Sequence, residues 1–269
     1  MSFSGFLIAI EGSDRIGKST LCRHLTEELK AVKLSFPDRS GPIGELINEH
    51  LQKKNKQNPK TLHYLFTANR AEKEDLILSH LKKGEIVVCD RYYLSGQIYT
   101  KNKDYKDFHF KDQEQLNHFS QFEENFLLLP DLTIIVHEKN IENIETRKDF
   151  GKECFETLEF QKNINAEFEI YAKKNPHTTL LIQSTSDWTS VKQQIVKEID
   201  ARRKEKAMQK GKCDFFLTLY LSLFLSLSLS LFLSLSLSLS FSLSLTLSFF
   251  LSFSRFLSLS LMVKFSRAE

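Results

Sequence analysis

Eight residues near the N-terminus have the types and spacing that bind phosphate. The segment from Gly12 to Ser19 reads GSDRIGKS, the G-x-x-x-x-G-K-S pattern of a phosphate-binding loop. Its glycines let backbone N–H groups surround a triphosphate, and a following helix N-terminus adds positive potential. In this chemistry Lys18 neutralises the β- and γ-phosphates, and Ser19 holds Mg²⁺. The predicted nucleotide site consists of Gly12, Ser13, Asp14, Arg15, Ile16, Gly17, Lys18, Ser19 and Thr20.

Two charged residues inside this loop have no role in simply cradling a nucleotide. An arginine beside the γ-phosphate can stabilise charge during phosphoryl transfer, so Arg15 is a candidate catalytic residue. Asp14 can accept a hydrogen bond from a sugar hydroxyl of a second substrate. Both side chains could equally be solvated loop residues, and the loop alone leaves this open.

The segments around the loop have the patterns that such a site requires. The apolar run at 6–10 predicts a buried strand, and Leu21, Leu25 and Leu29 form a helical stripe. Further apolar runs predict strands at 31–36, 85–90, 132–136 and 178–182. Helical patterns between and after them lie at 43–54, 59–82, 92–101, 112–127, 140–148, 156–174 and 191–203. This alternation predicts an α/β fold of the P-loop NTPase type, a three-layer sandwich in which helices cover both faces of a parallel sheet of about five strands.

Charged residues follow the predicted strands at the edge of the sheet where ligands bind. Asp90 ends an apolar strand, where P-loop enzymes keep the acid that orders Mg²⁺, although it could be an ordinary strand-end aspartate. Arg39 and Arg91 stand beside acids just after strands, and a guanidinium binds phosphate oxygens bidentately. Phe66 and Arg70 share one helix face. Phe66 is therefore either plain core or a ring on which a base stacks while Arg70 contacts the edge of the base.

Segments across the chain together resemble the eukaryotic thymidylate kinases. In chain order they read LIAIEGSDRIGKST, FPDRS, LFTANRAEKEDLI, VVCDRYYLSGQIY and FGKECFETLEFQ. The resemblance spans about residues 6–199, and FPDRS, ANR and DRYxxSG in this order are more specific than a phosphate-binding loop. It implies transfer of a phosphoryl group from ATP to dTMP, giving dTDP and ADP in dTTP biosynthesis, with Mg²⁺ as cofactor.

The resemblance also implies roles for individual residues. It makes Arg15, Lys18 and Asp90 catalytic, with Ser19 and Asp90 at the metal. The stretch from Arg147 to 161 resembles the mobile lid that closes over ATP, so Arg147 joins the ATP-binding residues. Arg39 and Arg91 would hold the dTMP phosphate, Phe66 and Arg70 the thymine, and Tyr99 and Asp14 the deoxyribose. The implied substrate-binding residues are Asp14, Arg39, Phe66, Arg70, Arg91, Ser95, Tyr99 and Gln161.

The lid segment departs from the family at two adjacent positions. Cys154 replaces a residue that is usually basic, and Phe155 replaces a residue that is usually tyrosine. These changes put the contacts of the lid in question rather than the reaction. We expect Lys148 and Lys152 to lower the pKa of the Cys154 thiol, which would make it the most reactive cysteine, and the alternative is an inert loop thiol.

Charge and cysteine usage exclude several classes of protein. The net charge of +3 gives no strong field for nucleic acid, and the N-terminus lacks the basic region of a signal peptide. The cysteines at 22, 89, 154 and 213 lack metal-site spacing, which predicts reduced thiols in a protein of the cytoplasm, or of the cytoplasm and nucleus. The family resemblance implies a homodimer. The alternatives are another nucleoside-monophosphate or deoxynucleoside kinase, and a membrane-anchored, non-catalytic nucleotide-binding protein.

The composition changes abruptly near Cys213. From Phe215 to Ser254 no charged residue occurs, and Leu or Phe alternates with Ser through most of the stretch. We therefore predict a thymidylate kinase-like domain at 1–205 and a low-complexity Leu/Ser/Phe tail at 206–269. A period of two is typical of a strand, but a strand of this length, about 130 Å, exceeds any domain of this size. Because a CT dinucleotide repeat translates as alternating Leu and Ser, the tail is interpreted as a disordered or artefactual terminus, with a membrane anchor as the alternative.

Overall fold

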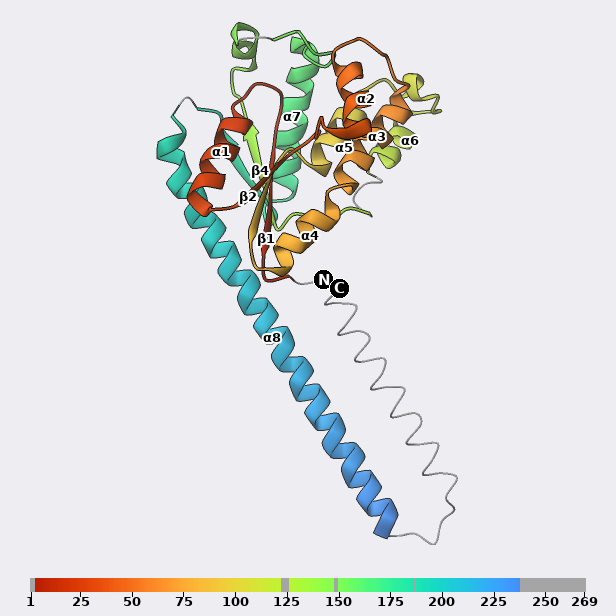
Figure 1. Cartoon of the computed structure of the whole chain (residues 1–269), viewed down its shortest axis with the longest axis vertical. Helices are drawn as coiled ribbons and strands as arrows, with labels where there is room; N and C mark the ends of the chain where they lie inside the picture. Colours follow the sequence, from red (N-terminus) through yellow and green to blue (C-terminus); the bar gives the residue numbers. More distant parts are fainter. Residues whose placement is uncertain (1–2, 122–125, 148–149, 186, 238–269) are drawn as a thin grey trace. The chain divides into compact units, whose positions relative to one another are not determined.

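A parallel β-sheet forms the centre of the protein (Figure 1). The computed structural model describes residues 3–121, 126–147, 150–185 and 187–237. The five strands lie in the order β2-β3-β1-β4-β5, and every neighbouring pair is parallel. They are β1 (Phe6–Glu11), β2 (Val32–Ser35), β3 (Ile86–Asp90), β4 (Leu132–His137) and β5 (Thr179–Gln183). The predicted α/β fold with about five parallel strands is confirmed.

Helices connect the strands and cover both faces of the sheet (Figure 1). The α-helices are α1 (Lys18–Leu29), α2 (Gly41–Leu51), α3 (Pro59–Ala71), α4 (Glu74–Lys82), α5 (Tyr93–Lys101), α6 (Gln113–Ser120), α7 (Leu158–Lys174) and α8 (Trp188–Leu237). Two 3-10 helices are η1 (Tyr105–Phe108) and η3 (Ile141–Thr146).

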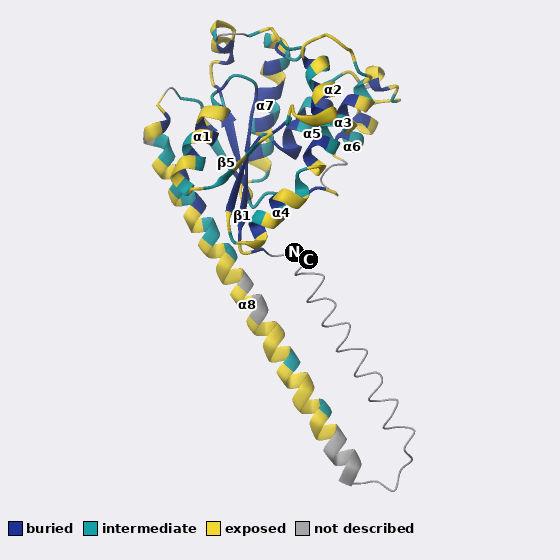
Figure 2. Cartoon of the chain, viewed as in Figure 1, coloured by how far each residue is buried: buried dark blue, intermediate teal, exposed yellow. Residues whose placement is uncertain are grey.

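The central strand β1 is buried over its whole length because each of its faces packs against a different set of helices. Ile8 and Ile10 belong to a cluster with residues of α1 and the start of α8. Leu7 and Ala9 belong to a second cluster with residues of α4, α5 and α7. Successive side chains of a strand point to opposite faces, so one short apolar run supplies both halves of the core. Figure 2 shows this as buried strands between helices that are exposed on their outer sides.

Three predicted helices between β2 and β5 differ from those of the structure. The helix predicted at 59–82 is two helices, α3 and α4, which break at Lys73. Lys73 forms an ion pair of 2.6 Å with Asp38, and Glu74 and Asp75 begin α4, where acidic side chains suit the positive end of a helix. The helix predicted at 112–127 ends at Ser120, and residues 122–125 lie outside the described part. In the segment predicted as a helix at 140–148, the described residues, up to Arg147, contain the 3-10 helix η3 and no α-helix.

The chain divides into two compact units between Asp200 and Ala201. The last core helix was predicted to end near Arg203, which is wrong, because α8 continues to Leu237. Leucine is a strong helix former, and serine hydroxyls here donate to carbonyls three residues earlier, as Ser222 does to Leu219 at 2.8 Å. At 100° per residue the alternation spreads leucines around every side of this helix, and most of them are exposed (Figure 2).

Within the described residues, no helix combines the length and apolar character needed to cross a membrane. Residues 238–269 of the predicted tail lie outside the described part.

We expect a chain shortened to end at Lys210 to fold and to be as active as the full chain. Its core is complete because the last buried residues of the first unit, Ile195 and Ile199, lie before the cut. Thermal melting and steady-state activity of the two proteins measure this. A chain that ends at Asp187 is the control, since it also loses Trp188 and should not fold. Each large buried side chain is worth about 2–5 kcal/mol, against a total stability of about 5–15 kcal/mol. Loss of activity on the Lys210 truncation would make the tail part of the enzyme.

Candidate active site

The phosphate-binding loop connects β1 to α1, and its shape depends on two glycines. Gly12 has φ +140°, and a Cβ there would lie 2.3 Å from the carbonyl oxygen of Val136. Gly17 has φ +96°, and a Cβ there would lie 2.9 Å from the Trp188 ring. Neither position accepts a side chain, so the loop passes tightly between β4 and the first turn of α8. Arg15 lies between these glycines and is itself left-handed, with φ 63°.

One pocket of about 550 Å³ brings together residues from distant parts of the sequence. It lies at the carboxyl ends of β1, β2 and β3, where ligands of such sheets bind. It also reaches α3 and α5. The predicted site residues that line it are Asp14, Arg15, Lys18, Ser19, Arg39, Phe66, Arg70, Asp90, Arg91, Ser95 and Tyr99.

The other predicted residues do not line this pocket. They are Gly12, Ser13, Ile16, Gly17, Thr20, Arg147 and Gln161. The last two hold the phosphate-binding loop in place. Gln161 is fully buried on α7; its amide oxygen accepts from the Asp14 N–H at 2.6 Å, and its amide nitrogen donates to the Asp14 carboxylate at 2.8 Å. Arg147 donates to the backbone oxygen of Arg15 and pairs with Glu138 at 3.0 Å.

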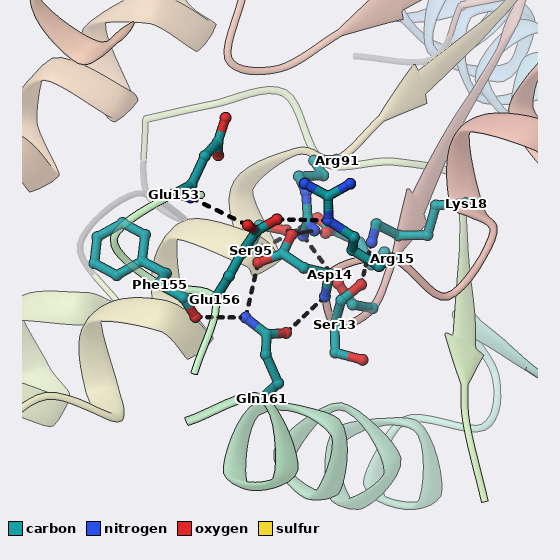
Figure 3. A network of polar contacts seen from close by, with 12 residues as sticks. Ser13, Asp14, Arg15, Lys18, Arg91, Ser95, Glu153, Phe155, Glu156 and Gln161 are labelled. Carbon is teal, nitrogen blue, oxygen red and sulfur yellow. Dashed lines mark hydrogen bonds and ion pairs between the residues drawn. The ribbon is translucent and has the colours of Figure 1, made fainter. Parts of the chain in front are cut away.

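Arg91 lies at the centre of the polar network beside the pocket (Figure 3). It has φ 67°, and its guanidinium donates to the Gly12 carbonyl at 2.9 Å and to the Ser95 hydroxyl at 3.1 Å. It also forms an ion pair with Asp14. Burial opposes ionisation of the Asp14 carboxyl, but the charges of Arg91 and Lys18 hold its pKa below the ordinary value. Asp14 is therefore an anion that orients the guanidinium.

The FPDRS and ANR segments are joined directly. The Asn69 side chain accepts from the Asp38 N–H and donates to the Asp38 carbonyl, both at 2.8 Å. This reciprocal pair fixes the loop that follows β2 against α3. Arg39 leaves that loop toward the pocket, where it donates to Asn48 at 2.8 Å and pairs with Glu153 at 2.6 Å.

Two glutamates of the lid segment contact arginines of the pocket, and neither was predicted. Glu156 is buried and accepts from the Nε of Arg15 at 2.7 Å (Figure 3). Glu153 pairs with Arg39, and its N–H donates to Glu156 at 3.1 Å. Acidic residues in a charged loop are usually solvated, so nothing in their spacing distinguished these two.

An aromatic cluster holds the lid segment over α5. The Phe155 ring lies 6.1 Å from Tyr99 and 5.8 Å from Phe160, centroid to centroid. The Nζ of Lys103 lies 4.3 Å from the centroid of Phe155, and burial lowers the pKa of this lysine to about 8. Lys103 lies between the helices predicted at 92–101 and 112–127, and only the fold brings it against the lid.

The expected lowering of the Cys154 pKa is wrong, and the order in which the cysteines react stays a prediction. Burial raises the pKa of the Cys154 thiol, and the cations that partly offset this effect are Lys103 and Lys53 rather than Lys152. Lys148 lies outside the described residues. Burial also raises the pKa of Cys22, to about 12, so none of these thiols is activated.

Lys18 and Asp90 supply the charge at the floor of the pocket. Lys18 is buried and donates to the Ser13 carbonyl, and burial together with the charge of Arg91 lowers its pKa to about 7. Asp90 ends β3 and is buried, and Ser19 lines the pocket in the first turn of α1. A hydroxyl and a carboxylate are the oxygen ligands that Mg²⁺ prefers, so this donor set fits the metal.

Comparison with known proteins identifies the family of this chain. A family model described as thymidylate kinase matches residues 10–195. The thymidylate kinase of Dictyostelium discoideum is 38% identical over 176 residues, which cover 63% of this chain and 73% of that protein. The thymidylate kinase of Plasmodium falciparum is 34% identical over 201 residues, which cover 72% of this chain and 90% of that protein.

The solved structures agree with the sequences. The structure of thymidylate kinase from Candida albicans matches with a TM-score of 0.65 at 33% identity, covering 76% of this chain and 95% of that one. The family model, at residues 10–195, includes every residue that lines the pocket. The chain belongs to the thymidylate kinase family.

Proposed function

We propose that this thymidylate kinase binds ATP at the phosphate-binding loop and dTMP against α3 and α5, within the single pocket described above. The protein phosphorylates dTMP to dTDP, as its family does. The observation that carries the proposed site is that the phosphate-binding loop, FPDRS, ANR and DRY, which are far apart in sequence, all line one cavity.

The donor end of the pocket would neutralise the transferring phosphate. Lys18 is placed to contact the β- and γ-phosphates, and the Arg15 guanidinium to stabilise charge on the γ-phosphoryl group in the transition state. Ser19 and Asp90 would hold Mg²⁺ together with phosphate oxygens. When bound, this ion neutralises charge on the phosphates and orients them. Glu156 must release the Nε of Arg15 before the guanidinium can turn to the phosphate.

The acceptor end of the pocket would position dTMP. Arg39 and Arg91 would hold its phosphate, Phe66 would stack on thymine, and Arg70 would contact an exocyclic oxygen of the base. The Tyr99 ring and the Asp14 carboxylate would contact the deoxyribose. Gln161 would act through Asp14 and the lid, since it bonds both and does not line the pocket. Little covalent chemistry remains for the protein, so positioning and charge neutralisation account for catalysis.

The choice of substrate tests the acceptor end. We expect Arg70→Ala to weaken the binding of dTMP by about 1–3 kcal/mol, because a buried polar contact to the base is lost. Tyr99→Ala should narrow the preference for dTMP over its ribose analogue, since the ring no longer fills the space of a 2′-hydroxyl. Steady-state kcat/KM for both substrates measures both effects. An unchanged ratio in Tyr99→Ala would show that Tyr99 does not contact the sugar.

Nucleotide binding should take up a proton at about pH 8. Because the pKa of Lys18 is lowered to about 7, this amine is largely neutral there in the free protein. A triphosphate beside it favours the ammonium and raises the pKa, so binding draws a proton from the buffer. Calorimetry of ATP binding in two buffers of different ionisation enthalpy measures the uptake, and Lys18→Met should abolish it. A buffer-independent enthalpy in the natural protein would contradict the assigned contact.

Family membership supports two further proposals. We expect a homodimer, which sedimentation of the purified protein measures. We expect the enzyme in the cytoplasm, either alone or together with the nucleus, and fractionation tests this along with the alternative of a membrane-bound tail.

A further inference from the structure

Glu11 is a fully buried carboxylate that was not among the predicted site residues. It is the last residue of β1, directly before Gly12 of the phosphate-binding loop, and none of its surface is exposed. Burial raises the pKa of its carboxyl, opposed by hydrogen bonds from Ser95 and by the charge of Arg91. A buried charge is costly unless it is fully hydrogen-bonded, so its contacts indicate what it does.

The hydrogen bonds to the Glu11 carboxylate come from the start of α5. Its Oε1 accepts from the Tyr92 N–H at 2.9 Å and from the Ser95 N–H at 3.2 Å. Tyr92 is the residue that precedes α5, and Ser95 lies in its first turn, where N–H groups have no partner within the helix. A side chain from a different strand therefore caps this helix and fixes its start relative to the phosphate-binding loop.

The second carboxylate oxygen connects this cap to Arg91. The Ser95 hydroxyl donates to Glu11 Oε2, which leaves its lone pairs free to accept from the Arg91 guanidinium at 3.1 Å. The same guanidinium nitrogen donates to the Gly12 carbonyl, one residue after Glu11. Arg91 is thus held from both sides by groups whose positions Glu11 sets.

We infer that Glu11 is a positioning residue that, through the Ser95 hydroxyl, aims Arg91 at the phosphate of dTMP. This inference rests on the proposed function, in which Arg91 binds that phosphate. Ser95 then serves as the bridge between the two charged groups rather than as a direct contact to the substrate.

Replacement of Glu11 by glutamine separates positioning from folding. The glutamine oxygen can still accept from both backbone N–H groups, so the cap survives. Its amide nitrogen, however, now donates to Ser95 Oγ, so the hydroxyl hydrogen loses its acceptor and must turn, which moves the lone pair that accepts from Arg91. Arg91 loses its orientation while the helix start is retained.

The affinities of dTMP and thymidine, measured by calorimetry, test this, because the two ligands differ only in the phosphate. We expect Glu11→Gln to lower the ratio of dTMP to thymidine affinity by about tenfold, with thymidine itself bound normally. Ser95→Ala should lower the ratio to a similar extent. The double variant should have the same ratio as Ser95→Ala alone, because both substitutions act through the Ser95 hydroxyl. Glu74→Gln is the matched control, since Glu74 also accepts a backbone N–H, from Leu128 at 3.0 Å, but does not line the pocket.

Two results would contradict the role of Glu11. Equal losses of dTMP and thymidine affinity in Glu11→Gln, or additive losses in the double variant, would overturn the inference. If Glu11→Gln does not fold, Glu11→Asp keeps the charge but withdraws it from Ser95 by one methylene, and must lower the same ratio. Arg91→Ala distinguishes a failure of the proposed phosphate contact from a failure of the inference about Glu11. An unchanged ratio in that variant refutes the proposed phosphate contact, whereas a lowered ratio with unchanged Glu11 and Ser95 variants refutes the inference alone.

Discussion

Replacement of Lys18 by methionine should lower kcat by about 10²–10³-fold and leave the protein folded. Lys18 lies at the floor of the pocket in the phosphate-binding loop, where its proposed partners are the β- and γ-phosphates. Methionine has a similar length and no charge, so the loop keeps its packing while the neutralising group is lost. Steady-state ADP release measures kcat, and Lys197→Met, which removes an exposed lysine of α8, serves as the control.

The same variant should be more stable than the natural protein at neutral pH. Burial lowers the pKa of Lys18 to about 7, so the unfolded chain binds more protons than the folded one between about pH 7 and pH 10. The free energy of unfolding therefore rises with pH across this window, and methionine removes that dependence. Retained kcat in a variant with a raised melting temperature would show that Lys18 is buried for a reason other than catalysis.

Replacement of Arg15 by alanine should lower kcat by about 10³-fold with little change in the KM for dTMP. The proposed role of this guanidinium is in the transition state, and loss of an arginine finger costs about 10³–10⁵ in rate. Glu156→Gln is the matched variant, because it removes the ion pair of 2.7 Å without removing the guanidinium, and it should retain kcat. An Arg15→Ala enzyme with normal kcat would contradict the catalytic assignment.

The sheet could be predicted from the sequence because buried parallel strands are short, continuous apolar runs. The segment FLIAI and the apolar run before Asp90 lie within β1 and β3 of the structure. The break at Lys73 could not be predicted in this way, because no glycine or proline marks it. It depends on an ion pair with Asp38, which lies on a loop that is distant in sequence.

The pocket could be predicted as far as its residues carried recognisable motifs. Arg39, Arg70 and Arg91 were each found beside a strand or helix signal, and all of them line the pocket. Glu11 and Glu156 were missed because a single glutamate has no pattern, and only the fold shows which arginine or helix it meets. The error at Cys154 has the same origin. Lys148 and Lys152 lie near it in sequence, but burial, which no periodicity predicts, raises its pKa.

Acceptor-dependent ADP release tests the central claim most directly. The purified full chain is assayed with ATP, Mg²⁺ and, in turn, dTMP, dUMP, UMP, AMP and thymidine. We predict the highest kcat/KM with dTMP, a lower value for every other monophosphate, and no turnover of thymidine, which lacks the accepting phosphate. Equal or greater use of another acceptor, or no ADP release that depends on dTMP, would contradict the assignment of this pocket to dTMP.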